Sequence, residues 1–496
     1  MWRPGCTRAT EPALTQVKTV VQRTGTLADM QQTSPESGPS IAEALLRDFD
    51  VAGPRYTSYP TADRFVEAFG APQYAQALQS RTEGAAAAAP LSLYVHIPFC
   101  ESVCYYCACN KVVTRQHGRA EEYLAALKRE IALHIAVLGP DQRVSQVHLG
   151  GGTPTFLSDG ELTELMGVLK DAFAWTPEAE ISIEVDPRTV DRQRLLHLAA
   201  LGFNRLSFGV QDFDPDVQRA VHRVQPFEQV RALLAAARES GFRSTNVDLI
   251  YGLPRQTPAS FVRTIEQVCE LRPDRIALYA YAHLPQRFKP QRRIAVAQLP
   301  PAEQRISMLS AALSQFASAG YTYVGMDHFA LADDSLAIAK RQGRLHRNFQ
   351  GYSTQPDCDL IGLGVSAIGK VGASYSQNAK TLDEYYDALE HGRFPVVRGL
   401  ALTRDDLVRR SVIMALMCQG RLDFESIELA HGIRIGDYFA SELEALAPLE
   451  ASGLVVREPG AIVVTPLGWY FVRRVAMVFD RYLPVGRARE QFSRLI

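Results

Sequence analysis

The sequence lacks long apolar runs, blocks of basic residues and any marked excess of charge. No apolar stretch approaches the roughly 18 residues that a membrane-spanning helix needs, so we expect no membrane span. The formal net charge is −1 over 496 residues, which argues against a nucleic-acid surface and leaves any anionic ligand to local Arg and Lys. Apolar residues make up 47% and charged residues 22%. This composition is typical of a globular protein, and the length exceeds one ordinary core.

The cysteines are not spread along the chain as they are in a secreted disulfide framework. Of the eight, Cys100, Cys104, Cys107 and Cys109 lie within ten residues, and the others are scattered. No second pair of closely spaced cysteines exists, whereas structural zinc sites usually draw paired hooks from two places. The arrangement indicates a metal site in a reducing compartment, and we expect the protein in the cytoplasm.

The N-terminal region differs from the rest in composition. Residues 1–40 are polar and lack sustained periodicity, so we expect them to be disordered. They weakly resemble a transit peptide, but the preferred interpretation is that translation starts at Met30 and that residues 1–29 are not made. Residues 41–90 form a lead-in segment, and its last part, with the run GAAAAAP, is predicted to be a linker.

Strand-like and helix-like segments alternate through residues 91–380. The strand-like ones are 91–97, 144–149, 180–185, 205–210, 246–251, 275–282 and 321–325, and the helical ones are 121–138, 159–173, 190–201, 214–221, 226–240, 258–271 and 302–319. The alternation indicates β-α units around a parallel sheet, and six or so repeats favour a full or partial (β/α) barrel over an open doubly wound sheet. In such barrels the functional residues follow the C-terminal ends of the strands.

Residues 381–496 show a different pattern. Helical spacing covers 404–418, 423–430 and 437–452, an apparent hairpin covers 454–457 and 461–465, and a last helix starts at 467. We therefore predict an α/β fold: a partial (β/α) barrel followed by a mostly helical, winged-helix-like C-terminal cap.

The cysteine cluster has the spacing Cys-x3-Cys-x2-Cys directly after the first predicted strand. Three thiolates can hold three irons of a 4Fe–4S cluster and leave the fourth iron open for a second molecule. The alternatives are a structural zinc site and buried free thiols. The spacing and the position favour the cluster, with Cys100, Cys104 and Cys107 as its ligands; Cys109 falls outside this set.

Polar groups follow the other predicted strands. Three glycines at 150–152 come after the second strand, Glu184 ends the third, Gln211 follows the fourth and Asp248 lies in the fifth. Glycines let a backbone approach a ligand closely, and the side chains, with Arg223, suit ribose hydroxyls and an amino-acid carboxylate.

With these motifs in order, the sequence resembles radical S-adenosylmethionine enzymes and, among them, the oxygen-independent coproporphyrinogen III oxidase family. The resemblance runs from about residue 53 to residue 496. The motifs that carry it lie at 53–61, 96–109, 150–154, 184–187, 209–212, 248–254, 281–285, 346–352 and 362–368.

The resemblance implies particular site residues. It implies a cluster on the three cysteines named above, and it places Cys109 and Gln350 at the reaction centre; plain packing is an equally good role for Cys109. His96 could lie beside the cluster, although a lone histidine on a strand is usually a core residue. The implied contacts to S-adenosylmethionine are Tyr94, Tyr106, Gly151, Gly152, Glu184, Gln211, Arg223, Asp248, Ala282 and Ile368. The family is also known to bind a second S-adenosylmethionine, which the sequence alone does not show.

The resemblance further implies a reaction. A 5′-deoxyadenosyl radical would convert two propionates of coproporphyrinogen III to vinyl groups in haem biosynthesis, in a monomer served by a reduced donor such as flavodoxin or ferredoxin. Arg55, Lys111, Arg115 and Arg347 lie in matching motifs and are candidates to pair with the propionates. The nearest alternative is a haem-binding or haem-delivery relative, which tends to lack the 53–61 motif and a cysteine at position 109; a plain iron–sulfur electron carrier is the third.

Overall fold

The computed structural model describes residue 46 and residues 52–83, 89–355 and 358–483. The disorder predicted for residues 1–40 and the proposed start at Met30 lie outside these residues, as does the middle of the predicted linker. No helix within the described ranges is both long enough and apolar enough to cross a membrane.

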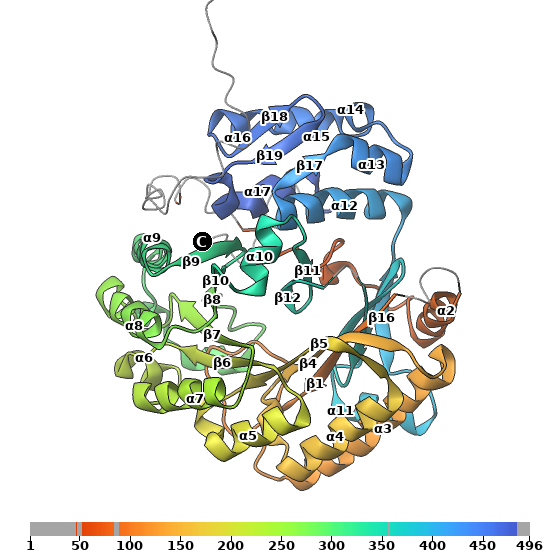
Figure 1. The fold of residues 1–496 in the computed structure, drawn as a ribbon, viewed down its shortest axis with the longest axis vertical. Coiled ribbons are helices and arrows are strands. Elements are labelled where there is room, and N and C mark those ends of the chain that lie inside the picture. The colour runs from red at the N-terminus through yellow and green to blue at the C-terminus, as the bar shows by residue number, and fades with distance from the viewer. Residues whose placement is uncertain (1–45, 47–51, 84–88, 356–357, 484–496) are drawn as a thin grey trace, which may run out of the picture. The chain divides into compact units, whose positions relative to one another are not determined.

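Among the described residues, one twelve-stranded sheet carries the fold (Figure 1), with the order β16-β15-β14-β13-β1-β4-β5-β6-β7-β8-β10-β9. The strands from β13 to β8 run parallel. They are β13 (Asp359–Leu363), β1 (Leu91–Ile97), β4 (Arg143–Gly151), β5 (Ala174–Val185), β6 (Arg205–Gln211), β7 (Ser244–Tyr251) and β8 (Arg275–Ala280). Among the described residues no pairing joins β16 to β9, so the barrel is partial, as predicted.

Helices cover the outer face of the parallel strands (Figure 1). In α4, Ser158 caps the first turn and exchanges hydrogen bonds with Glu161, and the buried face carries Leu162, Leu165 and Leu169. The outer helices are α3 (Gly118–Leu138), α4 (Asp159–Ala172), α5 (Arg192–Leu201), α6 (Pro215–Ala220), α7 (Phe227–Glu239), α8 (Pro258–Leu271) and α9 (Ala302–Ser318). The outer side chains of β5, β6 and β7 are buried beneath them, so alternate residues point into the barrel.

Two parts of the sheet differ from the prediction. β9 (Tyr321–Gly325) does not extend the parallel series, because β10 (His328–Leu331) lies between it and β8 and pairs antiparallel with both. The predicted boundary at residue 380 falls inside the sheet, which continues through β14 (Ile368–Val371), β15 (Ser374–Asn378) and β16 (Val396–Ala401). These strands are short, and β14 and β15 follow β13 without a helix between them, so the sequence shows no alternation of strands and helices there.

Several smaller elements accompany the sheet. A two-stranded hairpin, β11 (His346–Asn348) with β12 (Gly351–Ser353), follows α10 (Ser335–Arg341). In the lead-in segment, α2 (Ala71–Arg81) contacts the sheet through an ion pair of 3.0 Å between Arg81 and Asp359. Between β15 and β16 runs α11 (Leu382–Glu390).

The C-terminal part is mostly helical and includes the predicted hairpin. β17 (Arg421–Asp423), β19 (Ala461–Val464) and β18 (Val455–Glu458) form an antiparallel sheet in that order. The helix predicted over 437–452 is instead three short ones, and Pro448 stands in the first turn of the third, where proline is tolerated. The helices are α12 (Arg404–Gln419), α13 (Phe424–His431), α14 (Ile435–Tyr438), α15 (Ala440–Ala445), α16 (Ala447–Ala451) and α17 (Val472–Ala476).

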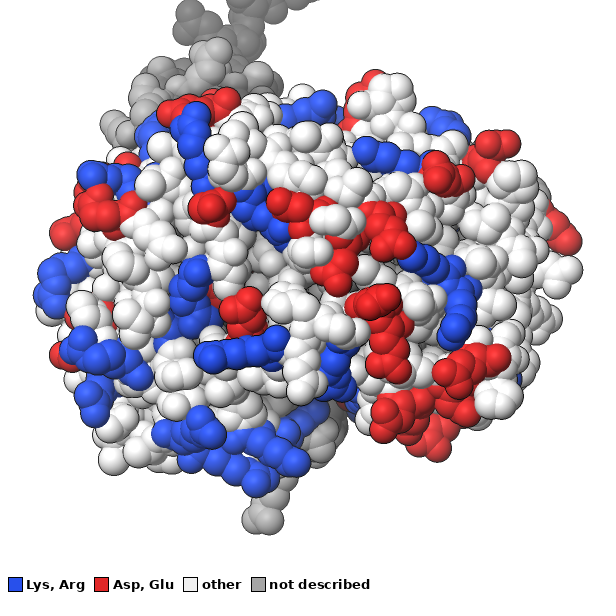
Figure 2. Space-filling view, turned by 90° about the horizontal axis from the view of Figure 1, so that it is seen from below, with Lys and Arg blue, Asp and Glu red and all other residues white. Residues whose placement is uncertain are grey.

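Charge on the surface is mixed. On the face shown in Figure 2, basic and acidic side chains gather in small groups of each sign, and most of the face is uncharged. This distribution fits the net charge of −1 and shows no continuous field of one sign.

A buried histidine in α3 leads to a prediction about acid stability. His134 is fully buried, its Nδ1 donates to the carbonyl of Glu130 at 2.8 Å, and its Nε2 accepts from the Tyr74 hydroxyl at 2.9 Å. Burial lowers the pKa of His134 to about 4. Between about pH 6.5 and pH 4 the unfolded chain therefore binds more protons at His134 than the folded chain does. The free energy of unfolding falls as the pH drops through this window, and His134 accounts for about 3 kcal/mol of that fall. Urea unfolding across this range should show less pH dependence in His134→Gln than in the wild type; an identical dependence would contradict the assignment.

Candidate active site

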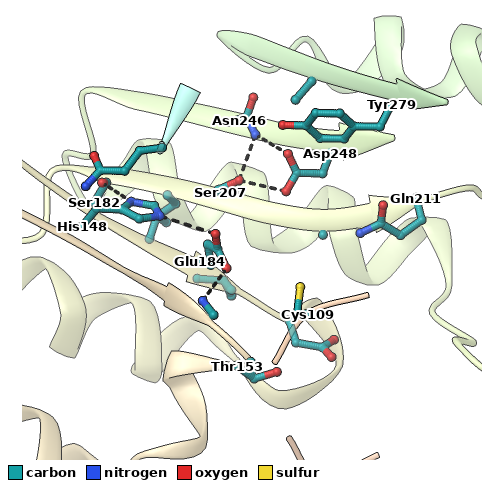
Figure 3. A pocket seen from close by; sticks show the side chains of 18 of the residues that line it. Cys109, His148, Thr153, Ser182, Glu184, Ser207, Gln211, Asn246, Asp248 and Tyr279 are labelled. Carbon is teal, nitrogen blue, oxygen red and sulfur yellow. Dashed lines mark hydrogen bonds and ion pairs between the residues drawn. The ribbon is translucent and has the colours of Figure 1, made fainter. Parts of the chain in front are cut away.

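A cavity of about 410 Å³ lies inside the curve of the parallel strands. Its wall combines the cysteine loop, the glycines after β4 and the inward side chains of β5, β6 and β7 (Figure 3). Of the predicted site residues, it brings together Cys100, Cys104, Cys107, Cys109, Tyr106, Gly151, Gly152, Glu184, Gln211, Arg223, Asp248 and Gln350.

The cysteine loop runs from β2 (Phe99–Cys100) to β3 (Val112–Val113), two short strands that pair with each other. The Thr153 hydroxyl donates to the Sγ of Cys100 at 3.4 Å. The Sγ of Cys104 accepts from Arg223 Nη1 at 3.5 Å and from Arg188 Nη2 at 3.6 Å. The sulfur atoms of Cys100 and Cys104 therefore face hydrogen-bond donors, and positive charge lies beside Cys104.

The thiols of the loop differ in acidity. A hydrogen bond from the Cys109 thiol lowers the pKa of Cys107, and the same contact raises the pKa of Cys109. Burial raises the pKa of Cys100 to about 11, so iron must displace its proton on binding. Cys107 is thus prepared as a thiolate ligand while Cys109, at the exposed edge of the loop, keeps its proton.

The residues fit an iron–sulfur cluster by the chemistry of their donors. Three soft thiol ligands line one cavity, and guanidinium and hydroxyl donors surround their sulfur atoms. Within the described ranges, no three His, Cys, Asp or Glu side chains converge on a single metal ion. A four-iron cluster does not require that convergence, because each thiolate binds a different iron.

A buried ion pair between Arg223 and Asp186 lies beside the cysteine loop. Arg223 and Asp186 are each 7% exposed, and Arg223 Nη1 lies 3.1 Å from Asp186 Oδ2. Arg188 joins the same carboxylate at 2.6 Å. Burial alone would raise the pKa of Asp186, but the charges of Arg223 and Arg188 hold it below its usual range. The pair fixes the Arg223 guanidinium against Cys104.

Glu184 connects the glycine turn to the inner face of the sheet (Figure 3). Its carboxylate accepts from the backbone N–H of Gly151 at 3.2 Å and from His148 Nε2 at 3.4 Å, while His148 Nδ1 lies 2.6 Å from the Ser182 hydroxyl. Burial would raise the pKa of Glu184, but these donors hold it below its usual range. Glu184 therefore presents a negative carboxylate to the cavity.

The next two strands add a second polar group. Ser207 and Asn246 both donate to the Asp248 carboxylate, at 3.1 Å and 2.9 Å, and the three side chains point toward one another in Figure 3. Burial raises the pKa of Asp248 to about 6. Such carboxylate and amide groups suit the hydroxyls of a ribose.

The sequence analysis did not identify four polar residues of the inner face, although their spacing along the strands indicates them. His148, Ser182, Ser207 and Asn246 each stand two positions before or after another polar residue on their strand. Polar residues at alternate positions of a strand otherwise rich in apolar residues mark a polar inner face. The sequence analysis considered mainly the residues at strand ends and therefore did not predict this polar inner face.

Three predicted contacts lie outside the cavity wall. Tyr94 stacks on His148 behind the wall, with ring centroids 5.9 Å apart. The carbonyl of Ala282 accepts from Gln291 Nε2, which also donates to the carbonyl of Tyr106 at 2.9 Å. Ile368 begins β14 and pairs with Gln377. The contacts predicted for these three stay predictions.

His96 is buried beside the cysteine loop. It is 6% exposed, and its ring nitrogens lie 3.0 Å from the carbonyl of Asn110 and 3.1 Å from the Tyr94 hydroxyl. Its ring fills the space beside Gly151, where an added Cβ would lie 2.5 Å from it. His96 thus holds the end of the cysteine loop in place.

The glycine turn allows a sharp prediction. A Cβ at Gly152 would lie 2.7 Å from the carbonyl carbon and oxygen of Pro98, which are backbone atoms just before the cysteine loop. Gly152→Ala should therefore displace the loop, lower the free energy of unfolding by about 1–3 kcal/mol and reduce cluster content. Urea unfolding and iron analysis test this.

Gly160→Ala is the matched control, because a Cβ there meets nothing within 4 Å. It should leave both quantities unchanged. Equal behaviour of the two variants would show that the close approach at Gly152 does not matter.

Comparisons with known proteins agree with this geometry. Residues 94–268 match the radical SAM superfamily and residues 402–471 match the HemN C-terminal domain. The chain is 51% identical over 453 residues to oxygen-independent coproporphyrinogen III oxidase of Escherichia coli, covering 91% of this chain and 98% of that protein. It is 50% identical over 454 residues to the protein of the same name from Pseudomonas aeruginosa, with the same coverage.

A solved structure extends the similarity to three dimensions. Coproporphyrinogen III oxidase from Escherichia coli, described as a radical SAM enzyme, superposes with a TM-score of 0.84 at 50% identity, covering 89% of this chain and 99% of that chain. Both the fold and nearly the whole length are shared. The chain belongs to the oxygen-independent coproporphyrinogen III oxidase family of radical S-adenosylmethionine enzymes.

Proposed function

We propose that this chain carries out the anaerobic oxidative decarboxylation of two propionates of coproporphyrinogen III, giving protoporphyrinogen IX. One observation carries the proposal: the three-cysteine loop and the polar strand ends meet in one cavity, in a chain that covers 98% of relatives with this activity in their name. The cofactors are a 4Fe–4S cluster and S-adenosylmethionine. When bound, they supply the one-electron chemistry that removes a hydrogen atom from a propionate.

The residues of the chain bind and orient the reactants. Cys100, Cys104 and Cys107 hold the cluster, and Arg223, fixed by Asp186, compensates negative charge beside it. The turn at 150–152 offers backbone groups to the amino-acid part of S-adenosylmethionine, with Glu184 behind it. Asp248, Asn246 and Ser207 face the ribose, and Gln211 adds an amide to the same wall.

Further parts of the proposal concern surroundings and partners. We assign residues 41–90 as a lead-in segment, the barrel from residue 91 to the end of β16, and the remainder as the C-terminal cap. The enzyme acts as a monomer in the cytoplasm and receives electrons from a reduced carrier such as flavodoxin or ferredoxin. Cys109 and Gln350, both on the cavity wall, face the reacting propionate.

The test is anaerobic turnover. The protein is reconstituted with iron and sulfide, reduced with dithionite and given S-adenosylmethionine and coproporphyrinogen III, and the products are followed by mass spectrometry. Loss of two carboxyl groups, with methionine and 5′-deoxyadenosine appearing, supports the proposal. If the cluster forms and haem binds tightly while coproporphyrinogen III stays intact, the activity is wrong and the chain is a haem carrier.

A further inference from the structure

One face of the cysteine loop points away from the cavity. Cys104 and Tyr106 line the cavity, whereas Tyr105 between them is not part of its wall. The Tyr105 ring instead stacks on the exposed ring of His222, with the ring centroids 5.1 Å apart, and the Tyr105 N–H donates to the carbonyl of Val221 at 3.0 Å. A molecule in contact with this aromatic pair therefore lies one residue along the chain from Cys104, a proposed cluster ligand.

A basic segment packs against the same part of the loop. It is the 3₁₀ helix η6 (Lys289–Arg293), which follows β8 and has the sequence KPQRR. Its buried Gln291 donates to the carbonyl of Tyr106 at 2.9 Å. The Arg293 guanidinium lies 5.0 Å from the centre of the Tyr105 ring and donates to the Tyr105 hydroxyl at 3.3 Å. These contacts fix η6 to the cysteine loop and leave its charged side chains on the surface.

The cations of η6 have no carboxylate partner. Its lysine and its two arginines are all exposed, and none of the three forms an ion pair in the described part of the chain. The neighbouring segments carry two exposed acids: Glu101 in the cysteine loop, and Asp216 in α6, which already pairs with Arg219. Positive charge is therefore in excess here. We call this region the basic loop surface; it consists of Tyr105, His222, Lys289, Arg292 and Arg293.

The charge and the position of the basic loop surface fit one kind of occupant. Unpaired cations attract an acidic partner, and tyrosine and arginine are among the side chains most enriched where proteins bind each other. A nucleic acid is also anionic, but a chain with a net charge of −1 lacks the broad basic surface that such a ligand requires. Because the surface adjoins the cysteine loop, the partner that fits is an acidic protein that delivers electrons there.

We propose that the basic loop surface is the docking site of an acidic protein that carries one electron, such as a reduced ferredoxin or flavodoxin. The proposal rests on the proposed function and specifies where its electron donor binds. In the complex the carrier is oxidised by one electron and the enzyme is reduced by one, and no bond is made or broken. Opposite charges speed the encounter, and the small surface suits a transient electron-transfer complex.

The first test measures binding to the full-length protein reconstituted with iron and sulfide, with an acidic 2Fe–2S ferredoxin as the probe. The double variant Arg292→Glu/Arg293→Glu should raise the Kd for ferredoxin about 10-fold or more, because attractive charges become repulsive ones. Raising the salt concentration from about 0.02 M to about 0.2 M should weaken binding to the wild type, and should weaken it less in the variant. Titration calorimetry measures both effects.

Turnover with two reductants separates docking from catalysis. Dithionite is a small molecule that needs no docking site, so the double variant should convert coproporphyrinogen III at the wild-type rate with dithionite and more slowly with subsaturating reduced ferredoxin. Arg129→Glu is the matched control, because Arg129 is exposed in α3, which lies on a different side of the barrel from α6 in Figure 1. It should leave the Kd for ferredoxin unchanged. Arg292→Lys/Arg293→Lys, which keeps both charges, should hold the Kd within about twofold of the wild-type value.

Several results would overturn the docking site. They are an unchanged Kd for ferredoxin in the double variant, an equal rise of the Kd in Arg129→Glu, and a dithionite-driven rate that falls as much as the ferredoxin-driven one. Tighter binding of a single-stranded RNA than of ferredoxin, lost in the double variant, would show a nucleic-acid surface instead. If the wild-type protein leaves coproporphyrinogen III unconverted with dithionite, the proposed function is wrong, whereas the Kd values for ferredoxin still decide whether the surface binds an acidic carrier.

Discussion

Cys104→Ala should prevent cluster assembly and abolish turnover of coproporphyrinogen III. The substitution removes one of the three proposed thiolate ligands and the sulfur that faces the guanidinium groups of Arg223 and Arg188. Cys109 is a poor replacement, because its position two residues after Cys107 does not restore the Cys-x3-Cys-x2-Cys spacing. The loss of activity should exceed the loss of about 10- to 100-fold that is typical when a residue supporting a metal ligand is replaced. Iron and sulfide content and product formation measure the effect.

Two other cysteines serve as controls for this result. Cys269 lies in α8, away from the cavity wall, so Cys269→Ala should keep both cluster and activity. Cys109→Ala should keep the cluster, since Cys109 is not among the proposed ligands. Full iron content in Cys104→Ala, or loss of the cluster in Cys109→Ala, would show that the ligand set is wrong.

Asp186→Ala should lower the free energy of unfolding by about 3–5 kcal/mol, the cost of leaving a buried charge without its partner. Both Arg223 and Arg188 lose their anion in this variant. With Arg223 no longer fixed against Cys104, the affinity for S-adenosylmethionine should fall as well. Urea unfolding and equilibrium binding measure the two effects.

The control uses an Arg–Asp ion pair that is exposed to solvent. Arg219 and Asp216 form an ion pair in α6 whose side chains are 61% and 64% exposed. Asp216→Ala should change the free energy of unfolding by no more than about 0.5 kcal/mol, because exposed pairs contribute little. A similar loss in both variants would mean that burial of Asp186 is not what gives the pair its importance.

The parallel part of the fold was predictable from the sequence, because its strands and helices each show their own periodicity of apolar residues. Strands such as β4 and β7 carry apolar residues that helices such as α4 and α8 cover, so both periodicities appear in the sequence. The strands β10 to β15 span three to five residues each, and among the described residues α10 is the one helix that interrupts them. Such short segments carry too few residues for periodicity to show. The place of β13 beside β1 depends on contacts between distant parts of the chain, which no local pattern encodes.

The candidate site was predictable where chemistry requires a rare spacing. The cysteine loop and the turn at 150–152 are such cases, and both line the cavity. Asp186 and Arg188 were not singled out, because an Asp and an Arg two residues apart occur throughout any globular protein. Their importance appears only when folding places Arg223 beside them.

The place of β1 in the sheet also determines when the site can mature. β1 carries the cysteine loop and lies between β4 and β13. During synthesis β4 emerges soon after β1, whereas β13 emerges only after the whole parallel series has left the ribosome. Until then one edge of β1 stays unpaired, and the loop beside it lacks its final support. Iron–sulfur delivery to this enzyme therefore belongs to a late stage of its biogenesis, after nearly all of the barrel has been translated.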